Sequence, residues 1–234
     1  MVMNNLNGII EKIDKHINQK DEIREHALKS SREVIILCRK AMQLLHNDNK
    51  DDALDNIKKS SEKLNELYTL TKPHPELYHA GFVENASQEY VEAYCLYNIL
   101  SGEDLPDPDT IQVTYSSYLL GLCDVVGELR RASLDFILKG ENQKSYEYLK
   151  YMDEIYGAIM SFDYPSALVP IKRKQDMVRN LIEKTRGELA VASCSQRIND
   201  HTNEFKGLLD TMNKDKKKNK QNKETIDIDI DQVW

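Results

Sequence analysis

Residues 9–45 read IIEKIDKHINQKDEIREHALKSSREVIILCRKAMQLL, a stretch without proline or glycine. Apolar side chains recur in it at helical spacing, first at Ile9, Ile13 and Ile17 and then between Val34 and Leu45. The four residues that follow, HNDN at 46–49, have the composition of a chain break. The sequence therefore predicts one very long helix that ends near residue 46.

The rest of the chain continues this helical pattern. All six prolines fall in three short places, and helix breakers are scarce between them. No segment alternates with period two for long enough to form a sheet. The predicted fold class is therefore all-α, an antiparallel bundle of about six or seven long helices within residues 1–195. After the first helix, the predicted segments are about 51–71, 76–100, 112–139, capped by Gly140, then 142–162 and 166–193.

Composition and charge exclude several classes of protein. The 234 residues are 40% hydrophobic and carry a formal net charge of −7, which argues against disorder and against a basic nucleic-acid binder of the usual kind. No apolar run approaches the length of about 18 residues that a membrane span needs, and no signal peptide is recognisable, so we expect a soluble, cytoplasmic protein. The cysteines are scattered singly, and we expect all four to be reduced core residues: Cys38, Cys95, Cys123 and Cys194.

The C-terminal segment differs from the body of the chain. NKDKKKNKQNK at 213–223 carries six lysines, and ETIDIDIDQVW follows it with four acids. Such a composition cannot bury a core, so residues 196–234 are predicted to be a helix extension followed by a mobile charged tail. The tail either keeps the protein soluble or adds a contact to RNA phosphates.

Four acidic residues stand out in two of the predicted helices. Glu89 and Glu92 are three residues apart in QEYVEAYCLY, and Asp124 and Glu128 are four apart in LLGLCDVVGELRR, so each pair shares a helix face. The apolar residues around them place these acids near buried surface, where unpaired carboxylates are costly. Oxygen ligands without histidine or thiol suit Mg²⁺, or Mn²⁺, far better than zinc. The quartet is therefore a candidate metal site.

Two glycines lie beside the second acidic pair. Gly121 and Gly127 each cost a helix about 1 kcal/mol relative to alanine. That cost is tolerated where another helix or a substrate approaches the backbone closely. The alternative interpretation is a solvated acidic face whose carboxylates pair with Arg130 and Arg131.

The two acidic motifs resemble those of a known family. QEYVEA at 88–93 and YLLGLCDVVGEL at 118–129 closely resemble the motifs of Trax, the catalytic relative of translin, and the resemblance extends over about residues 5–195. Translin-type chains share the fold and generally lack the acidic quartet. The resemblance implies a Mg²⁺-dependent endoribonuclease that cleaves single-stranded RNA inside a hollow, roughly octameric shell. It also implies that the catalytic and metal-binding acids, which activate a water, are Glu89, Glu92, Asp124 and Glu128.

The chain departs from eukaryotic Trax in two respects. It begins almost at the first helix, and it crosses between the two motif helices in about ten residues. Both features are typical of a prokaryotic or archaeal homologue. We therefore expect either a homo-oligomer, most simply an octamer, or an assembly with a translin-like partner chain.

An enclosed cavity would reconcile the acidic charge with RNA binding, because basic side chains can line the cavity while acids face solvent. The first helix offers candidates that we expect to bind the phosphates of single-stranded RNA, and of single-stranded DNA: Arg24, Lys29, Arg32, Arg39 and Lys40. Arg32 and Arg39 are seven residues apart and share one face. The alternative is an ordinary solvated stripe, because acidic residues are interleaved.

Two other functions compete with this interpretation. Di-iron four-helix proteins use two ExxH motifs, and the chain offers one, at Glu76–His79. The non-enzymatic alternative is a translin-like shell that binds single-stranded RNA or DNA and whose acids are structural. Cleavage of a labelled RNA that depends on a divalent metal would separate these classes.

Overall fold

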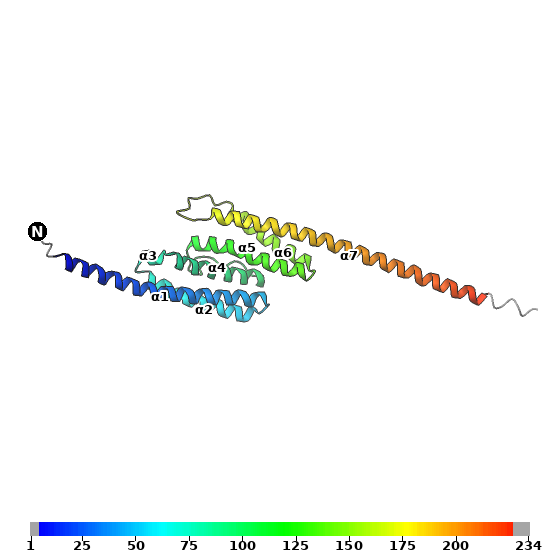
Figure 1. Ribbon diagram of the computed structural model, residues 1–234, viewed down its shortest axis with the longest axis horizontal. Coiled ribbons are helices and arrows are strands. Elements are labelled where there is room, and N and C mark those ends of the chain that lie inside the picture. The colour runs from blue at the N-terminus through cyan, green and yellow to red at the C-terminus, as the bar shows by residue number, and fades with distance from the viewer. Residues whose placement is uncertain (1–4, 227–234) are drawn as a thin grey trace, which may run out of the picture.

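The computed structural model describes the backbone of residues 5–226 and the side chains of residues 5–212. Over that range the regular elements are all helices, which confirms the predicted class (Figure 1). None of the helices described is both long and apolar enough to cross a membrane. Their bounds are α1 Leu6–His46, α2 Lys50–Thr71, α3 Pro75–Tyr78, α4 Gly81–Ser101, α5 Tyr115–Leu138, α6 Asn142–Ile159 and α7 Lys172–Ile226.

The helices pack as successive neighbours in an elongated bundle. α1 packs against α2 and α4, α5 packs against α4 and α6, and α7 closes the bundle against α5 and α6 (Figure 1). Short connections, such as residues 47–49 between α1 and α2, make consecutive helices antiparallel. The two helices with the acidic motifs, α4 and α5, therefore lie in the middle of the bundle, between α1 and α7.

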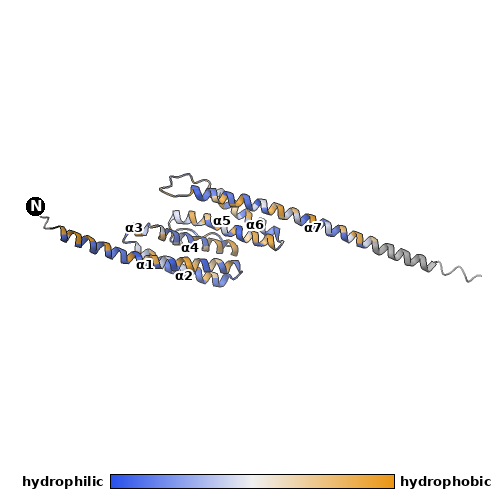
Figure 2. Cartoon of the chain, viewed as in Figure 1, coloured by the Kyte–Doolittle hydropathy of each residue, from blue (hydrophilic) through white to orange (hydrophobic). Residues whose placement is uncertain are grey.

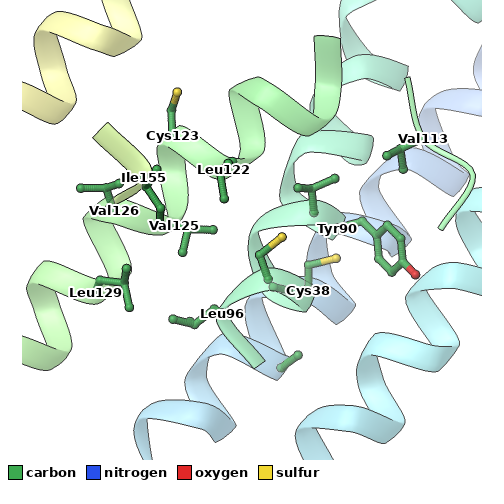
Figure 3. Close-up of a cluster of buried hydrophobic side chains, with 14 of the residues drawn as sticks. Cys38, Tyr90, Leu96, Val113, Leu122, Cys123, Val125, Val126, Leu129 and Ile155 are labelled. Carbon is green, nitrogen blue, oxygen red and sulfur yellow. The ribbon is translucent and has the colours of Figure 1, made fainter. Parts of the chain in front are cut away.

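The core holds α4 and α5 in place. Cys38 of α1, Leu96 of α4 and Leu129 of α5 are fully buried within one continuous cluster (Figure 3). Burial of an aliphatic side chain of this size contributes roughly 1.5–3 kcal/mol. The acidic residues thus project from helices whose spacing is set by a packed interior.

Gly121 lies where α4 and α5 approach most closely. A Cβ atom at this position would come within 2.8 Å of both the Gln88 carbonyl oxygen and Val91 Cβ. The predicted close approach of a neighbouring helix is therefore confirmed at Gly121. At Gly127 an added Cβ would meet nothing within 4 Å, so no neighbouring helix accounts for this glycine, and approach of a substrate there stays a prediction.

Several predicted helix boundaries differ from those in the structure. The segment predicted as one helix over 76–100 is divided into α3 and α4, because the chain turns at His79–Ala80. α7 begins at Lys172 instead of 166, since Pro170 disfavours helical backbone at the residue before it. α7 then continues without a break to Ile226, past the helix predicted over 166–193 and through the predicted helix extension, because no proline follows. The lysine-rich run predicted as a mobile tail is part of this helix, and residues 227–234 lie outside the described range.

Two local predictions concern Gly140 and the cysteines. Gly140 follows α5 with φ of 75°, and its amide donates to the Ile137 carbonyl, so the predicted cap is confirmed. All four cysteines are free, as predicted, and three of them are buried. Cys194 is exposed, because it lies where α7 leaves the bundle, so the prediction of a core position is wrong for this residue.

Candidate functional site

The four predicted acids meet between α4 and α5. Glu89 and Glu92 project from α4, and Asp124 and Glu128 project from α5. Each of the other three acids raises the pKa of Glu92 by repulsion, so all three lie within electrostatic reach of Glu92. Three of them border an open cavity of about 460 Å³, whose lining is Arg39, Met42, Gln43, Glu89, Glu92, Glu128 and Arg131.

Glu92 is the member of the quartet that lacks a protein partner. Within the described part of the chain, its carboxylate makes neither a hydrogen bond nor an ion pair. Burial, followed by repulsion from Asp124, Glu89 and Glu128, raises its pKa from 4.5 to about 8, against an opposing effect of Lys174. Glu92 is therefore largely protonated at neutral pH unless a cation lies beside it.

Glu89 and Asp124 receive their countercharge from helices on either side of the central pair. Arg39 of α1 lies with Nη2 3.3 Å from Glu89 Oε1. Lys174, in the first turn of α7, donates from Nζ to both carboxylate oxygens of Asp124. Charge-assisted hydrogen bonds of this kind orient the carboxylates as well as neutralise them.

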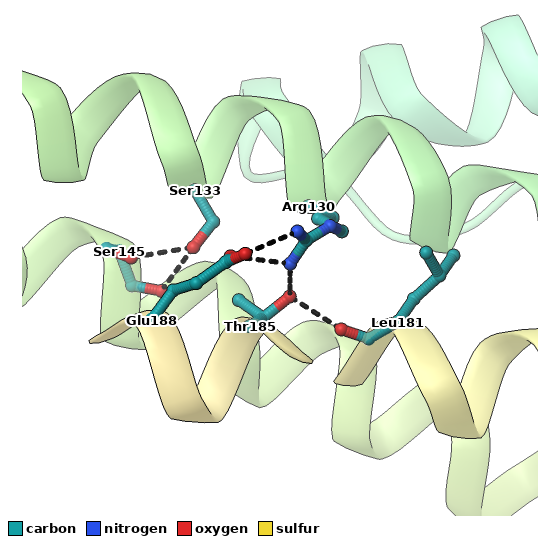
Figure 4. Close-up of polar contacts among 6 residues, drawn as sticks. All are labelled: Arg130, Ser133, Ser145, Leu181, Thr185 and Glu188. Atoms are coloured by element: carbon teal, nitrogen blue, oxygen red, sulfur yellow. Dashed lines mark hydrogen bonds and ion pairs between the residues drawn. The ribbon is translucent and has the colours of Figure 1, made fainter. Parts of the chain in front are cut away.

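Glu128 is held by the end of α1. His46 Nε2 shares a hydrogen bond with Glu128 Oε2, and this contact lowers the pKa of the Glu128 carboxyl. Arg131 Nη1 lies 3.8 Å from the same oxygen. The alternative of arginine pairing is therefore correct for Arg131, whereas Arg130 reaches α7, with Nη1 2.8 Å from Glu188 Oε2 (Figure 4).

The quartet has the ligand types that a hard divalent cation prefers, but its carboxylates are not arranged to hold one. All four donors are carboxylates, the ligands that Mg²⁺ takes, and the unpartnered Glu92 adds negative charge at their centre. As the described side chains stand, no three His, Cys, Asp or Glu residues are close enough together to hold a metal ion. The contacts of Asp124 with Lys174 and of Glu128 with His46 turn oxygens toward these cations. A metal ion would have to compete with both contacts.

The five basic residues predicted to bind nucleic acid are all exposed on α1, and they differ in their surroundings. Arg39 lines the cavity beside the acids. Arg24 is paired with two acids of its own helix, at 3.4 and 2.8 Å. Lys29, Arg32 and Lys40 make no ion pair with any residue whose side chain is described. The structure thus brings one of the five to the acidic site.

Sequence reasoning does not find His46 and Lys174. His46 stands in the predicted chain break, 82 residues from its partner acid, and Lys174 is one of three basic residues in a row, 50 residues from its own. Neither spacing leaves a local signal. The ExxH motif, by contrast, is not part of this site, because Glu76 lies on α3 and pairs with Lys20 of α1.

Known sequences match this chain over most of its length. A model of the Translin family matches residues 22–187. An uncharacterized protein of Methanocaldococcus jannaschii is 34% identical over 204 residues, which cover 86% of this chain and 88% of that protein. Both matches span α4 and α5 with the acidic motifs.

Solved structures show the same fold. AfC3PO in a complex with duplex RNA has a TM-score of 0.71 and 30% identity, over 80% of this chain and 97% of that chain. The crystal structure of AfC3PO covers the same shares with the same TM-score and 31% identity. Apo-NeC3PO, at 19% identity and a TM-score of 0.71 over 82% of this chain and 98% of that chain, shares the fold. The resemblance carried by the two acidic motifs is confirmed, and the chain belongs to the Translin family.

Proposed function

We propose that this protein binds RNA within an oligomeric shell and cleaves it as a Mg²⁺-dependent endoribonuclease. The observation that carries the proposal is the meeting of two acidic pairs beside a cavity that also holds Arg39 and Arg131. Hydrolysis of a phosphodiester needs oxygen ligands for a divalent cation and positive side chains for the phosphate, and both are present. RNA as the substrate class is supported by AfC3PO, which is 30% identical and forms a complex with duplex RNA.

The residues that would hold Mg²⁺, or Mn²⁺, are Glu89, Glu92, Asp124 and Glu128. A bound divalent cation supplies Lewis acidity, which polarises a phosphoryl oxygen and lowers the pKa of water. Lys174 and His46 contact two of these carboxylates in the metal-free chain. Both contacts neutralise carboxylate charge, and a divalent cation would have to displace them.

Proton transfer and phosphate binding would be performed by side chains of the cavity. A carboxylate of the quartet that does not serve as a metal ligand would act as the general base that accepts the proton of the attacking water. Arg39 and Arg131 border the cavity, where their guanidinium groups are placed to bind a phosphate through paired hydrogen bonds. Since no base-reading module accompanies them, cleavage should show little sequence preference.

Affinity for RNA should depend on α1 more than on the C-terminal segment. Arg32 and Arg39 share a face, and Arg39 reaches the cavity. Replacing both by alanine should weaken binding of single-stranded RNA about tenfold or more and reduce the salt dependence by up to about two phosphate contacts. Deleting residues 213–234, with their six lysines, should have a smaller effect. The reverse ranking would contradict an RNA path along α1.

A closed homo-oligomer, most simply an octamer, is the form in which a chain of net charge −7 could enclose RNA. Light scattering at micromolar concentration should then give the mass of about eight chains. A translin-like second chain would be needed if the protein alone gave a smaller closed assembly that lacked RNA binding. A monomeric mass would contradict the enclosure of RNA.

A shell that binds RNA without cutting it is the second candidate. The observation in its favour is that three of the four acids already have cationic partners, as structural carboxylates do. Cleavage of labelled single-stranded and duplex RNA, in Mg²⁺ and in EDTA, separates the two candidates. Glu89→Gln and Glu128→Gln should abolish cleavage and keep RNA binding, whereas Glu62→Gln, an exposed carboxylate on α2, should change neither. Binding without metal-dependent cleavage in the wild type would establish the second candidate.

A further inference from the structure

α7 extends well beyond the part of the chain that the family model and the AfC3PO structures cover. The family match ends at residue 187, and 97% of the AfC3PO chain is accounted for by 80% of this one. α7 continues to Ile226 and projects from one end of the bundle (Figure 1). This projection thus lies outside the residues that the family model matches, and the proposed nuclease site does not explain it.

The projection carries an apolar stripe with a heptad repeat. Val191, Ile198, Phe205 and Met212 are spaced seven residues apart, and their exposures are 68%, 60%, 62% and 58%. Apolar positions recur along this part of α7 in Figure 2. A strict seven-residue spacing on an exposed helix is the pattern of a coiled-coil a position.

A second row completes the seam. Cys194, His201 and Leu208 fall three residues after successive members of the first row, at d positions. We call the two rows together the α7 seam. It lies on the side of the helix away from the bundle, because the bundle contacts are made by Leu189, which is 1% exposed, and by Gln196, which accepts a hydrogen bond of 2.6 Å from Asn142.

We propose that the α7 seam is a dimerisation surface, which pairs with the seam of a second copy of this chain as an antiparallel coiled coil. In the register that aligns a with d positions, Val191 faces Leu208, Ile198 faces His201, and Cys194 faces Phe205 of the other copy. Each copy keeps its own bundle on the outer side of its helix, so the two bundles do not obstruct the pairing. The contact is isologous and closes after two copies.

Charge complementarity favours the antiparallel arrangement. The same register places Arg197 beside Glu204 of the second copy, and two-fold symmetry makes this pair twice. Within the described part of the chain, Arg197 has no ion pair, and Glu204 pairs with His201 of its own helix at 3.4 Å. A parallel pair would instead set Arg197 against Thr202 and Glu204 against Leu209. It would also bring together the lysine runs of both copies.

The other exposed apolar stripe fits the α7 seam less well. Leu6, Ile10 and Ile13 lead along the start of α1 to Ile17, and each is about half exposed. The next seam position on α1 is a lysine, Lys20, so the stripe ends there. It could cover only about half of the 22 residues from Val191 to Met212. A second α7 covers all of them.

Disulfide trapping in the full-length protein tests the proposal, because Cys194 is exposed and the other three cysteines are buried. Phe205→Cys places a thiol opposite Cys194 of the second copy, within reach of a disulfide. Mild oxidation with diamide should give a covalent dimer on a non-reducing denaturing gel, at least tenfold more than in Met212→Cys. In that control, which also changes an a position, the nearest thiols of different copies are offset by about 10 Å along the axis. Adding Cys194→Ser should abolish the dimer.

A second designed pair guards against disruption of the seam by Phe205→Cys. Val191→Cys with Leu208→Cys, in a Cys194→Ser background, should also form the covalent dimer. A dimer from either pair, and not from the wild type, supports the antiparallel seam. Absence of the dimer in both pairs, or equal trapping of Met212→Cys, overturns it. A wild-type dimer through Cys194 overturns it in favour of a parallel pair, because antiparallel copies hold these thiols about 16 Å apart. None of these outcomes depends on RNA or metal.

Discussion

Replacing Glu92 by glutamine should stabilise the metal-free protein at alkaline pH and leave it nearly unchanged in acid. Burial and three neighbouring acids raise the pKa of Glu92 from 4.5 to about 8 in the folded chain. Between these two pH values the folded state binds more protons than the unfolded state, so stability falls as pH rises through this window. Each pH unit of the shift corresponds to about 1.4 kcal/mol, and partial solvent access reduces the total to roughly 2–4 kcal/mol. Glutamine cannot ionise, so the variant escapes this loss.

Thermal unfolding in EDTA at pH 5, 7 and 9 measures the effect. The melting temperature of Glu92→Gln should match that of the wild type at pH 5 and exceed it by about 5–10 °C at pH 9. Glu62→Gln, which removes the same charge from an exposed position, should show no such trend. A Glu92→Gln variant that melts at or below the wild type at pH 9, or whose difference is the same at every pH, refutes the reasoning.

Mg²⁺ should reduce the difference in stability between the wild type and Glu92→Gln. If the quartet binds the ion, Mg²⁺ at about 100 times its dissociation constant stabilises the wild type by roughly 2.7 kcal/mol through mass action. Glu92→Gln has one carboxylate fewer and should gain less. Equal gains in both proteins would show that the ion binds elsewhere.

The remaining predictions concern the packing and the cations around the quartet. Gly121→Ala should destabilise the fold by about 2–4 kcal/mol, since its Cβ would lie 2.8 Å from α4. Gly127→Ala should be neutral or stabilise the fold by up to about 1 kcal/mol. Equal urea midpoints for the two variants would contradict the close approach at Gly121. Lys174→Met should lower the melting temperature in EDTA by about 2–6 °C. It should also tighten Mg²⁺ binding in calorimetry, because it removes the cation that competes for Asp124. Weaker Mg²⁺ binding by the variant would contradict that competition. His46→Gln should lower the free energy of unfolding by about 1–2 kcal/mol at pH 6–7 and by less at pH 4. The reason is that His46 lowers the pKa of the Glu128 carboxyl, and this stabilisation is lost when acid protonates Glu128. A destabilisation independent of pH would contradict this reasoning.

The parts of the fold that could be predicted are those that local sequence patterns determine. The apolar spacing between Ile9 and Leu45 predicts α1 almost to the residue, because amphipathic periodicity and the break at 46–49 act within a few residues. The start of α7 could not be placed in the same way. Residues 166–169 have a helical composition, and one later residue, Pro170, excludes them. The C-terminal end of α7 could not be predicted either. A charged composition excludes a buried core, but it does not distinguish an exposed helix from a coil.

The acids of the candidate site were predictable, whereas their partners were not. Helical spacing places Glu89 and Glu92 on one face because three residues make almost one turn, and the same holds for the pair on α5. The choice of Arg131 over Arg130 as a partner depends on which side of α5 faces α7. Arg130 points there and meets Glu188, so it is not available to the quartet. Such choices follow from the packing of the bundle, which no single helix specifies.

The position of α4 and α5 in the middle of the bundle explains why the compensation of charge is incomplete. Apart from Arg131 of α5, which lies 3.8 Å from Glu128, cations reach the quartet from the flanking helices. α1 contacts the quartet at Glu89 and Glu128, and α7 contacts it at Asp124. Glu92 faces the other three acids, so no flanking side chain pairs with it and its pKa rises. The unpaired carboxylate is thus a consequence of the helix order, and it is the feature on which the proposed metal site depends.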